Sequence, residues 1–224
     1  MYIPDVIPLE DRENLLGKYR SLNGSAEPDL GKNPALLIVD MTNGFVMDRF
    51  RTGFSKTGIP CSANIKKMLD LFRRKKLPVI YTRDMTSDQD VYRIHRGTWN
   101  NKSEPVPADQ RTDYNTIYSE IAPLKGEPVI EKSKPSAFFG TPLISMLNYL
   151  HVTGIVLTGM VTSGCVRATA LDAFSYNYTV AIPQECVADR SKISHEVTLF
   201  DLDLKYAYVL SSSEIAGILN RSNH

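Results

Sequence analysis

GIVLTGMVTSGCVRATALDAFSYNYTVAIP, residues 154–183, contains two short apolar runs separated by a segment of helical character. The runs GIVLTG (154–159) and YTVAIP (178–183) are typical of strands that are buried on both faces. CVRATALDAFSYN (165–177), between them, predicts a helix. A strand, a helix and a second strand in this order form a βαβ unit, in which the two strands are parallel.

The same alternation extends along the chain in both directions. It predicts further strands over 35–41, 77–82, 128–132 and 207–211, and further helices over 62–75, 141–150 and 195–206. Ser62 is the expected N-cap of the first of these helices. The pattern predicts a three-layer α-β-α fold of the Rossmann-like kind, with a mostly parallel sheet of about six strands.

The remaining segments surround this predicted core. Residues 1–33 are expected to form an N-terminal arm with a short helix over 11–22, and residues 34–224 are expected to form one domain. A polar stretch over 83–113 contains the only tryptophan, Trp99, and is interpreted as a long loop over a site.

The composition argues against several classes of protein. The chain has 26 Lys and Arg against 25 Asp and Glu, a formal net charge of +1, which argues against a nucleic-acid partner. No segment resembles a signal peptide or is apolar enough to span a bilayer. Three cysteines do not make a disulfide framework. We therefore expect a cytoplasmic protein without a membrane partner.

Chemically reactive residues follow three of the predicted strands. Asp40 ends the first, Lys132 ends the third, and Cys165 opens the helix after the fourth, so the fold brings all three to one edge of the sheet. A free thiol has a pKa of about 8.5, and a helix N-terminus alone supplies too little stabilisation to make it a thiolate near neutral pH. The rest of the stabilisation that the thiolate needs can come from Lys132 as a neighbouring cation and from Asp40 as a base that takes the proton.

Position alone leaves other interpretations open for these residues. Cys165 can be a small buried apolar residue, Asp40 can cap a turn, and Lys132 can be solvated. The other cysteines have no convergent partner, since Cys61 is expected in a loop before a helix and Cys186 after the fifth strand.

Four segments decide between these interpretations: LLIVDMTNGFV (36–46), VIEKSKPSAFFGTPL (129–143), TGMVTSGCVRATALDAFSYNY (158–178) and HEVTLFDLDLKYAYVLS (195–211). In order and spacing they resemble the isochorismatase-like cysteine hydrolases, from about Pro34 to the last strand. Within this superfamily, TSGCVRATALDA and LFDLDLKY look most like the branch of N-carbamoylsarcosine amidohydrolase and maleamate amidohydrolase.

The resemblance implies a catalytic triad made of Asp40, Lys132 and Cys165. In the family pattern the lysine stands four residues before the serine of Ser-Ala-Phe. Counting back from Ser136 gives Lys132 rather than Lys134.

The resemblance also implies a cis peptide bond four residues before the cysteine, which is the Met160–Val161 bond here. Its expected effect is to place the N–H of Val161 beside that of Cys165 as an oxyanion hole. Many relatives in this branch have threonine where this chain has Val161, so the identity of the substrate stays open.

The implied activity is hydrolysis of a small linear amide or ureido compound like N-carbamoylsarcosine, with release of ammonia through a thioester on Cys165. Maleamate, biuret and ureidoacrylate are alternative substrates. Two alternatives belong to other classes, a non-catalytic binding module on the same fold and a thiol redox sensor. The intact triad argues against the first, and the lack of a second cysteine close in sequence argues against the other.

We expect no cofactor and no catalytic metal. The nicotinamidase branch binds a metal through an Asp-x-His pair and a further histidine, and NGFVMDRFRTGF (43–54) contains no histidine. His95 stands alone, and His151 and His195 are interpreted as capping or packing residues.

Substrate contacts are expected from pocket residues around the triad. The alternative role of Arg167 is packing or an ion pair with a neighbouring carboxylate. The family resemblance also implies a homo-oligomer, either a dimer or a tetramer. The expected substrate-binding residues are Phe45, Trp99, Thr162 and Arg167, and the cations that can reach a substrate carboxylate are Arg83, Arg93 and Arg96.

Overall fold

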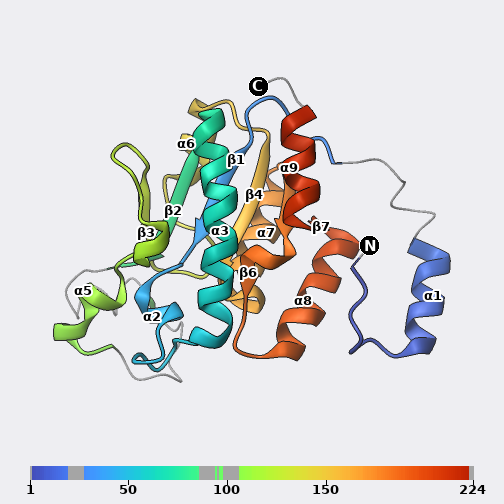
Figure 1. Ribbon diagram of the computed structural model, residues 1–224, viewed down its shortest axis with the longest axis horizontal. Helices are drawn as coiled ribbons and strands as arrows, with labels where there is room; N and C mark the ends of the chain where they lie inside the picture. Colours follow the sequence, from blue (N-terminus) through green and yellow to red (C-terminus); the bar gives the residue numbers. More distant parts are fainter. Residues whose placement is uncertain (1, 20–27, 86–93, 95, 98–105, 222–224) are drawn as a thin grey trace.

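The computed structural model describes residues 2–19, 28–85, 94, 96–97 and 106–221, and its centre is a parallel β-sheet (Figure 1). In the described residues this sheet has seven strands in the order β3-β2-β1-β4-β5-β7, with the short β6 beside the end of β4. Its strands are β1 (Ala35–Val39), β2 (Val79–Asp84), β3 (Val129–Lys132), β4 (Gly154–Met160), β5 (Thr179–Pro183), β6 (Val187–Ala188) and β7 (Tyr208–Leu210).

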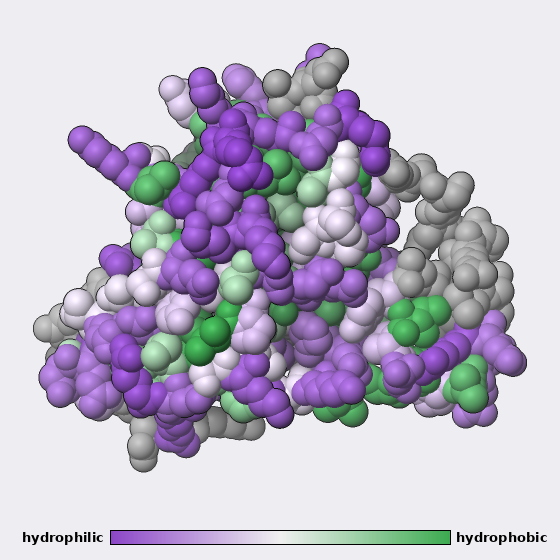
Figure 2. Space-filling view, in the orientation of Figure 1, coloured by the Kyte–Doolittle hydropathy of each residue, from purple (hydrophilic) through white to green (hydrophobic). Residues whose placement is uncertain are grey.

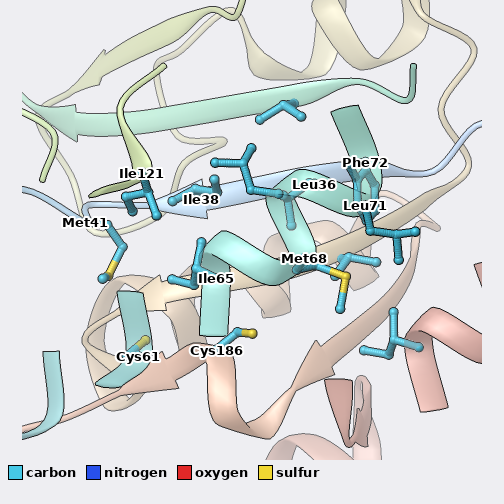
Figure 3. Packing of buried hydrophobic residues seen from close by; sticks show 14 of the residues in the cluster. Leu36, Ile38, Met41, Cys61, Ile65, Met68, Leu71, Phe72, Ile121 and Cys186 are labelled. Atoms are coloured by element: carbon cyan, nitrogen blue, oxygen red, sulfur yellow. The ribbon is translucent and has the colours of Figure 1, made fainter. Parts of the chain in front are cut away.

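Helices cover both faces of the sheet (Figure 1). Alternate residues of β1 point to opposite faces, so Leu36 and Ile38 pack in one apolar cluster and Leu37 and Val39 in another. Side chains of α3 (Ser55–Lys75) and α9 (Ser212–Arg221) complete the first cluster, part of which is drawn in Figure 3. The second cluster is completed by α6 (Leu143–Tyr149), α7 (Arg167–Ser175) and α8 (Lys192–Lys205). The expected three-layer α/β fold is confirmed.

The start of α3 differs from the prediction. The helix begins at Ser55, seven residues before the predicted N-cap, and it contains Pro60. Ser62 is buried inside the helix, where its hydroxyl donates to the carbonyl of Ile59 and to the carboxylate of Glu120. Cys61 is therefore a helical core residue and not a loop residue.

The elements that were not predicted include α2 (Asn43–Val46), β6 and α9. The four-residue α2 and the two-residue β6 are too short to give a periodic pattern. The third, α9, follows the last predicted strand and buries Ile215, Ile218 and Leu219 on one side.

The polar stretch after β2 is described in part. Arg93 and Trp99 lie outside the described residues. The ring of Tyr114, the last residue of α5 (Arg111–Tyr114), contacts Phe45 of α2, and Ile117 shortly after it forms a β-bridge with Thr42. In the arm, α1 (Leu9–Tyr19) lies beyond α8 (Figure 1), and the backbone N–H of Tyr2 donates to Asp203 Oδ2 at 2.6 Å. Leu30 is buried in the first apolar cluster, so the chain packs against the domain shortly before β1.

The face of the molecule that carries α3 is mainly hydrophilic, with small apolar areas between charged side chains (Figure 2). Within the described ranges, no helix has both the length and the apolar composition needed to cross a membrane.

Candidate active site

A buried ion pair lies at the carboxyl edge of the sheet. Asp40 directly follows β1 and Lys132 is the last residue of β3, and Lys132 Nζ lies 2.7 Å from Asp40 Oδ2. The side chains are 2% and 0% exposed. Asp40 has a positive φ of 52°, a conformation that aspartate tolerates better than most residues. Since removing two charges from water costs several kcal/mol per ion, this pair indicates a specific role.

The strand between β1 and β3 holds the other carboxylate oxygen. Thr82 lies in β2, and its Oγ1 donates to Asp40 Oδ1 at 2.8 Å. The backbone N–H of Asp40 donates to the carbonyl of Thr82 at 3.1 Å. The carboxylate of Asp40 is thus fixed from two neighbouring strands. Sequence reasoning missed Thr82, although its position at the end of a predicted strand could have indicated it.

Cys165 reaches the same place from β4. It lies in η3, a turn of π-helix over Thr162–Val166, and α7 begins only at Arg167. Its Sγ is 3.5 Å from Lys132 Nζ, and the residue is 5% exposed. The structure therefore brings the three predicted residues together around one ammonium group.

Strands β4 and β1 are in close contact just before this turn. Gly159 has a φ of +118°, and a Cβ at this position would lie 2.0 Å from the carbonyl oxygen of Val39. Only glycine fits this approach. The peptide bond between Met160 and Val161 is cis, as the family resemblance implied.

The two neighbouring lysines have different roles. Lys132 Nζ faces Asp40 and Cys165 and also donates to the carbonyl of Lys134 at 3.1 Å. Lys134 Nζ instead donates to the carbonyl of Arg96 at 2.5 Å, so it holds the chain after β2. The lysine that faces the thiol is the one chosen from the spacing to Ser136.

Burial and charge determine the protonation states. Burial, together with the nearby Asp40 carboxylate, raises the pKa of Cys165 to about 12, although Lys132 opposes the shift. Burial disfavours the charged form of Lys132, but Asp40 and Cys165 outweigh it and raise the pKa of Lys132 above its ordinary value. In the free protein the sulfur is therefore a neutral thiol beside an ammonium, and a base must remove its proton during reaction.

The protonation state gives a first prediction. Because the pKa values of Cys165 and Lys132 are raised, neither group loses its proton between pH 7 and 9. Absorbance at 240 nm is expected to show no Cys165 thiolate in this range, measured as wild type minus Cys165→Ala, and kcat/KM is expected to show no alkaline loss. A Cys165 thiolate signal at any pH up to 9 would contradict this prediction.

A second acid lies beside Lys132 and was not predicted. Asp84 ends β2 in register with Lys132 and is buried, and its Oδ2 lies 3.4 Å from Arg96 Nη1. Arg96, a candidate for binding a substrate carboxylate, is thus already held by a carboxylate of this chain. Arg83, another candidate, pairs with Glu131 at 2.8 Å at the surface.

The prediction that Phe45 forms a pocket wall stays a prediction. Phe45 is in α2, three residues after Thr42, and is partly buried with its ring centroid 5.9 Å from that of Tyr114. Trp99, the other aromatic candidate, lies outside the described residues.

Two other candidates have partners within the protein. Thr162 is fully buried, and its hydroxyl lies 2.8 Å from Nδ1 of His195 in α8. Arg167 lies 3.5 Å from Asp201 and is 41% exposed, which matches its alternative role as half of a surface ion pair. Both side chains are directed toward α8.

Metal ligands do not converge in the part of the chain that the structure describes, where no three His, Cys, Asp or Glu side chains are grouped to hold an ion. His95 lies outside the described residues.

Comparison with known proteins identifies the family. Residues 34–214 match the isochorismatase domain. The chain belongs to the isochorismatase family. Maleamate amidohydrolase of Pseudomonas putida is 31% identical over 92% of this chain and 95% of its own length. N-carbamoylsarcosine amidase of an Arthrobacter species is 32% identical over 85% of this chain and 72% of its own length.

A solved structure supports the same family branch. The crystal structure of N-carbamoylsarcosine amidase from Thermoplasma acidophilum superposes with a TM-score of 0.65 at 30% identity, covering 80% of this chain and 96% of that one. These relatives confirm the predicted family and branch, and they confirm the enzyme class at the level of an amidohydrolase of the isochorismatase family.

Proposed function

We propose that this protein hydrolyses a small linear amide or ureido compound like N-carbamoylsarcosine and releases ammonia, with Cys165 as the nucleophile. The observation that carries the proposal is the ammonium of Lys132, buried between the Asp40 carboxylate at 2.7 Å and the Cys165 sulfur at 3.5 Å. The relatives that are named for maleamate and N-carbamoylsarcosine support the substrate class.

In the first half of the reaction, Asp40 takes the thiol proton while Sγ bonds to the carbonyl carbon of the substrate. The carbonyl oxygen becomes an oxyanion, which the N–H groups of Val161 and Cys165 stabilise. When this intermediate collapses, the carbon–nitrogen bond breaks and the nitrogen receives the proton held by Asp40. Ammonia leaves, and a thioester remains on Cys165.

In the second half, a water molecule gives a proton to Asp40 and its oxygen bonds to the thioester carbon. The carbon–sulfur bond then breaks, and the sulfur regains the proton from Asp40. The product is a carboxylic acid, or a carbamic acid when the substrate is a ureido compound.

Lys132 contacts both groups between which the proton moves. As the proton moves from Sγ to Asp40, negative charge moves from the carboxylate to the sulfur. The ammonium of Lys132 contacts both groups, so it stabilises the negative charge on the carboxylate before the transfer and on the sulfur after it. Proton transfer is then compatible with a strongly paired base.

Maleamate, biuret and ureidoacrylate are alternative substrates for the same mechanism. A binding module without catalysis is the alternative of another class, but such a module has no need for a buried charged pair beside a thiol. The predicted homo-oligomer, a dimer or a tetramer, is measured by light scattering of the purified protein.

An ammonia-release screen tests the proposal. Purified protein is incubated with N-carbamoylsarcosine, maleamate, biuret, ureidoacrylate and simple amides, with and without a chelator. We expect chelator-independent ammonia release from at least one carboxylate-bearing compound. No release from any compound, or release that the chelator abolishes, would contradict the proposal.

A further inference from the structure

The turn that carries Cys165 is held by side chains from outside its own segment. The η3 turn over Thr162–Val166 has no side-chain cap at its start, and its own backbone bonds join Gly164 and Val166 to the carbonyl of Val161. This turn contains one N–H of the proposed oxyanion hole and directly follows the other. Whatever fixes it also fixes the two donors.

One support is the carboxylate of Asp189, in the short segment between β6 and α8. Asp189 Oδ2 accepts from both the N–H and the hydroxyl of Ser163, at 2.8 and 2.7 Å. Its other oxygen accepts the backbone N–H of Arg190 at 2.7 Å and that of Ser191 at 3.4 Å. The residue is 7% exposed, so these bonds are shielded from water.

The second support is His195, in the first turns of α8. Its Nδ1 lies 2.8 Å from the hydroxyl of Thr162, which is fully buried. This hydroxyl is engaged inside the protein, so Thr162 is better explained as a support of the turn than as a substrate ligand.

The pairing of β6 with β4 brings the first support into position. Gly159 and Met160, at the end of β4, pair with Val187 and Ala188. Asp189 follows directly, beside the turn that β4 leads into. Two consecutive residues of the turn are therefore attached to the segment that opens α8.

We propose that Asp189 and His195 are positioning residues that hold the η3 turn so that its N–H groups point at the developing oxyanion. This inference rests on the proposed function. A displacement of about 1 Å at a catalytic group can lower the rate about 10²-fold, and loss of one oxyanion donor lowers it by about 10²–10³-fold. The effect falls on kcat, because the oxyanion exists only during the reaction.

The test begins with Asp189→Asn. Asparagine has the same shape but only one acceptor oxygen, so it loses the bonds to Ser163 or those to Arg190 and Ser191. We expect kcat to fall by about 10²-fold with KM changed by less than threefold. Alkylation of Cys165 by iodoacetamide, which forms no oxyanion, is expected to keep its wild-type rate within threefold.

The second variant pair concerns His195. Replacement by alanine removes the partner of Thr162, whereas His195→Asn places an amide near the former Nδ1. We expect the alanine variant to lose about tenfold in kcat and the asparagine variant to regain most of it. This rescue keeps the proposal testable if Asp189→Asn fails to fold.

Asp203→Asn is the matched control, since Asp203 lies at the other end of α8 and likewise accepts backbone N–H groups, from Tyr2 and Val209. Its kcat is expected to equal that of wild type. The inference is overturned if Asp189→Asn keeps kcat within threefold of wild type, or if kcat and alkylation fall together. If the wild-type protein shows no turnover, the proposed function is overturned, and this inference with it. If the wild-type protein is active and the Asp189 and His195 variants have the same kcat, only this inference is overturned.

Discussion

Replacing Cys165 by alanine is expected to abolish ammonia release, with kcat lowered on the order of 10⁴- to 10⁶-fold, as for loss of the nucleophile in other enzymes with covalent intermediates. Without the sulfur no thioester forms, and Asp40 with water has no efficient alternative route. The fold is expected to persist, because the change removes one buried atom and leaves the Asp40–Lys132 pair intact. Ammonia release and thermal unfolding, measured on the same preparation, check both statements.

Cys186→Ala is the matched control for that experiment. Cys186 is also fully buried, and burial raises its pKa to about 12. It packs in the cluster on the α3 side of the sheet (Figure 3), whereas Cys165 belongs to the cluster on the other face. We expect this variant to turn over like wild type. Turnover that survives in Cys165→Ala, or that depends on Cys186, would refute the assignment of the nucleophile.

Replacing Lys132 by methionine is expected to lower both stability and activity. Methionine has a similar length but no charge, so Asp40 remains buried without its counter-ion. Breaking a buried ion pair from one side costs about 3–5 kcal/mol of unfolding free energy. Loss of the ammonium also removes the group that stabilises the charge during proton transfer, and we expect kcat to fall about 10³-fold. Urea denaturation and ammonia release measure the two effects.

A double variant separates these two effects. Asp40→Asn combined with Lys132→Met removes both charges, and asparagine tolerates the positive φ of residue 40 and can still accept from Thr82. Most of the lost stability is expected to return, since replacing a whole buried pair is often neutral. Activity is not expected to return, because the base is gone. Additive losses of stability would mean that the two side chains are not coupled in solution.

The sheet edge and its three reactive residues could be predicted from the sequence. Buried parallel strands give continuous apolar runs, and the residues that follow these runs must meet at one edge. Asp40, Lys132 and Cys165 were identified in this way, and the family resemblance then separated Lys132 from Lys134. The same argument could have identified Thr82, which also ends a predicted strand, but Thr82 was missed.

The supports around the site could not be predicted in this way. Asp189 reaches Ser163 only because the two-residue β6 pairs with the end of β4, and such a short strand has no periodicity to detect. The bond between Thr162 and His195 joins residues 33 positions apart, on η3 and α8. The early start of α3 was hidden by Pro60, which usually marks a helix boundary. Each case depends on tertiary packing that overrides the local signal.

Trapping with hydroxylamine tests the central claim, a thioester on Cys165, most directly. Wild-type protein is given a substrate found in the ammonia screen together with increasing hydroxylamine, and both products are quantified. A thioester is attacked by hydroxylamine in competition with water. The trapped product is a hydroxamate when the substrate is an amide and an N-hydroxyurea when it is a ureido compound. We predict that this product increases while the hydrolysis product decreases, and that Cys165→Ala forms neither. Ammonia release with no trapped product at any hydroxylamine concentration would contradict the account, because it would mean that water attacks the substrate directly.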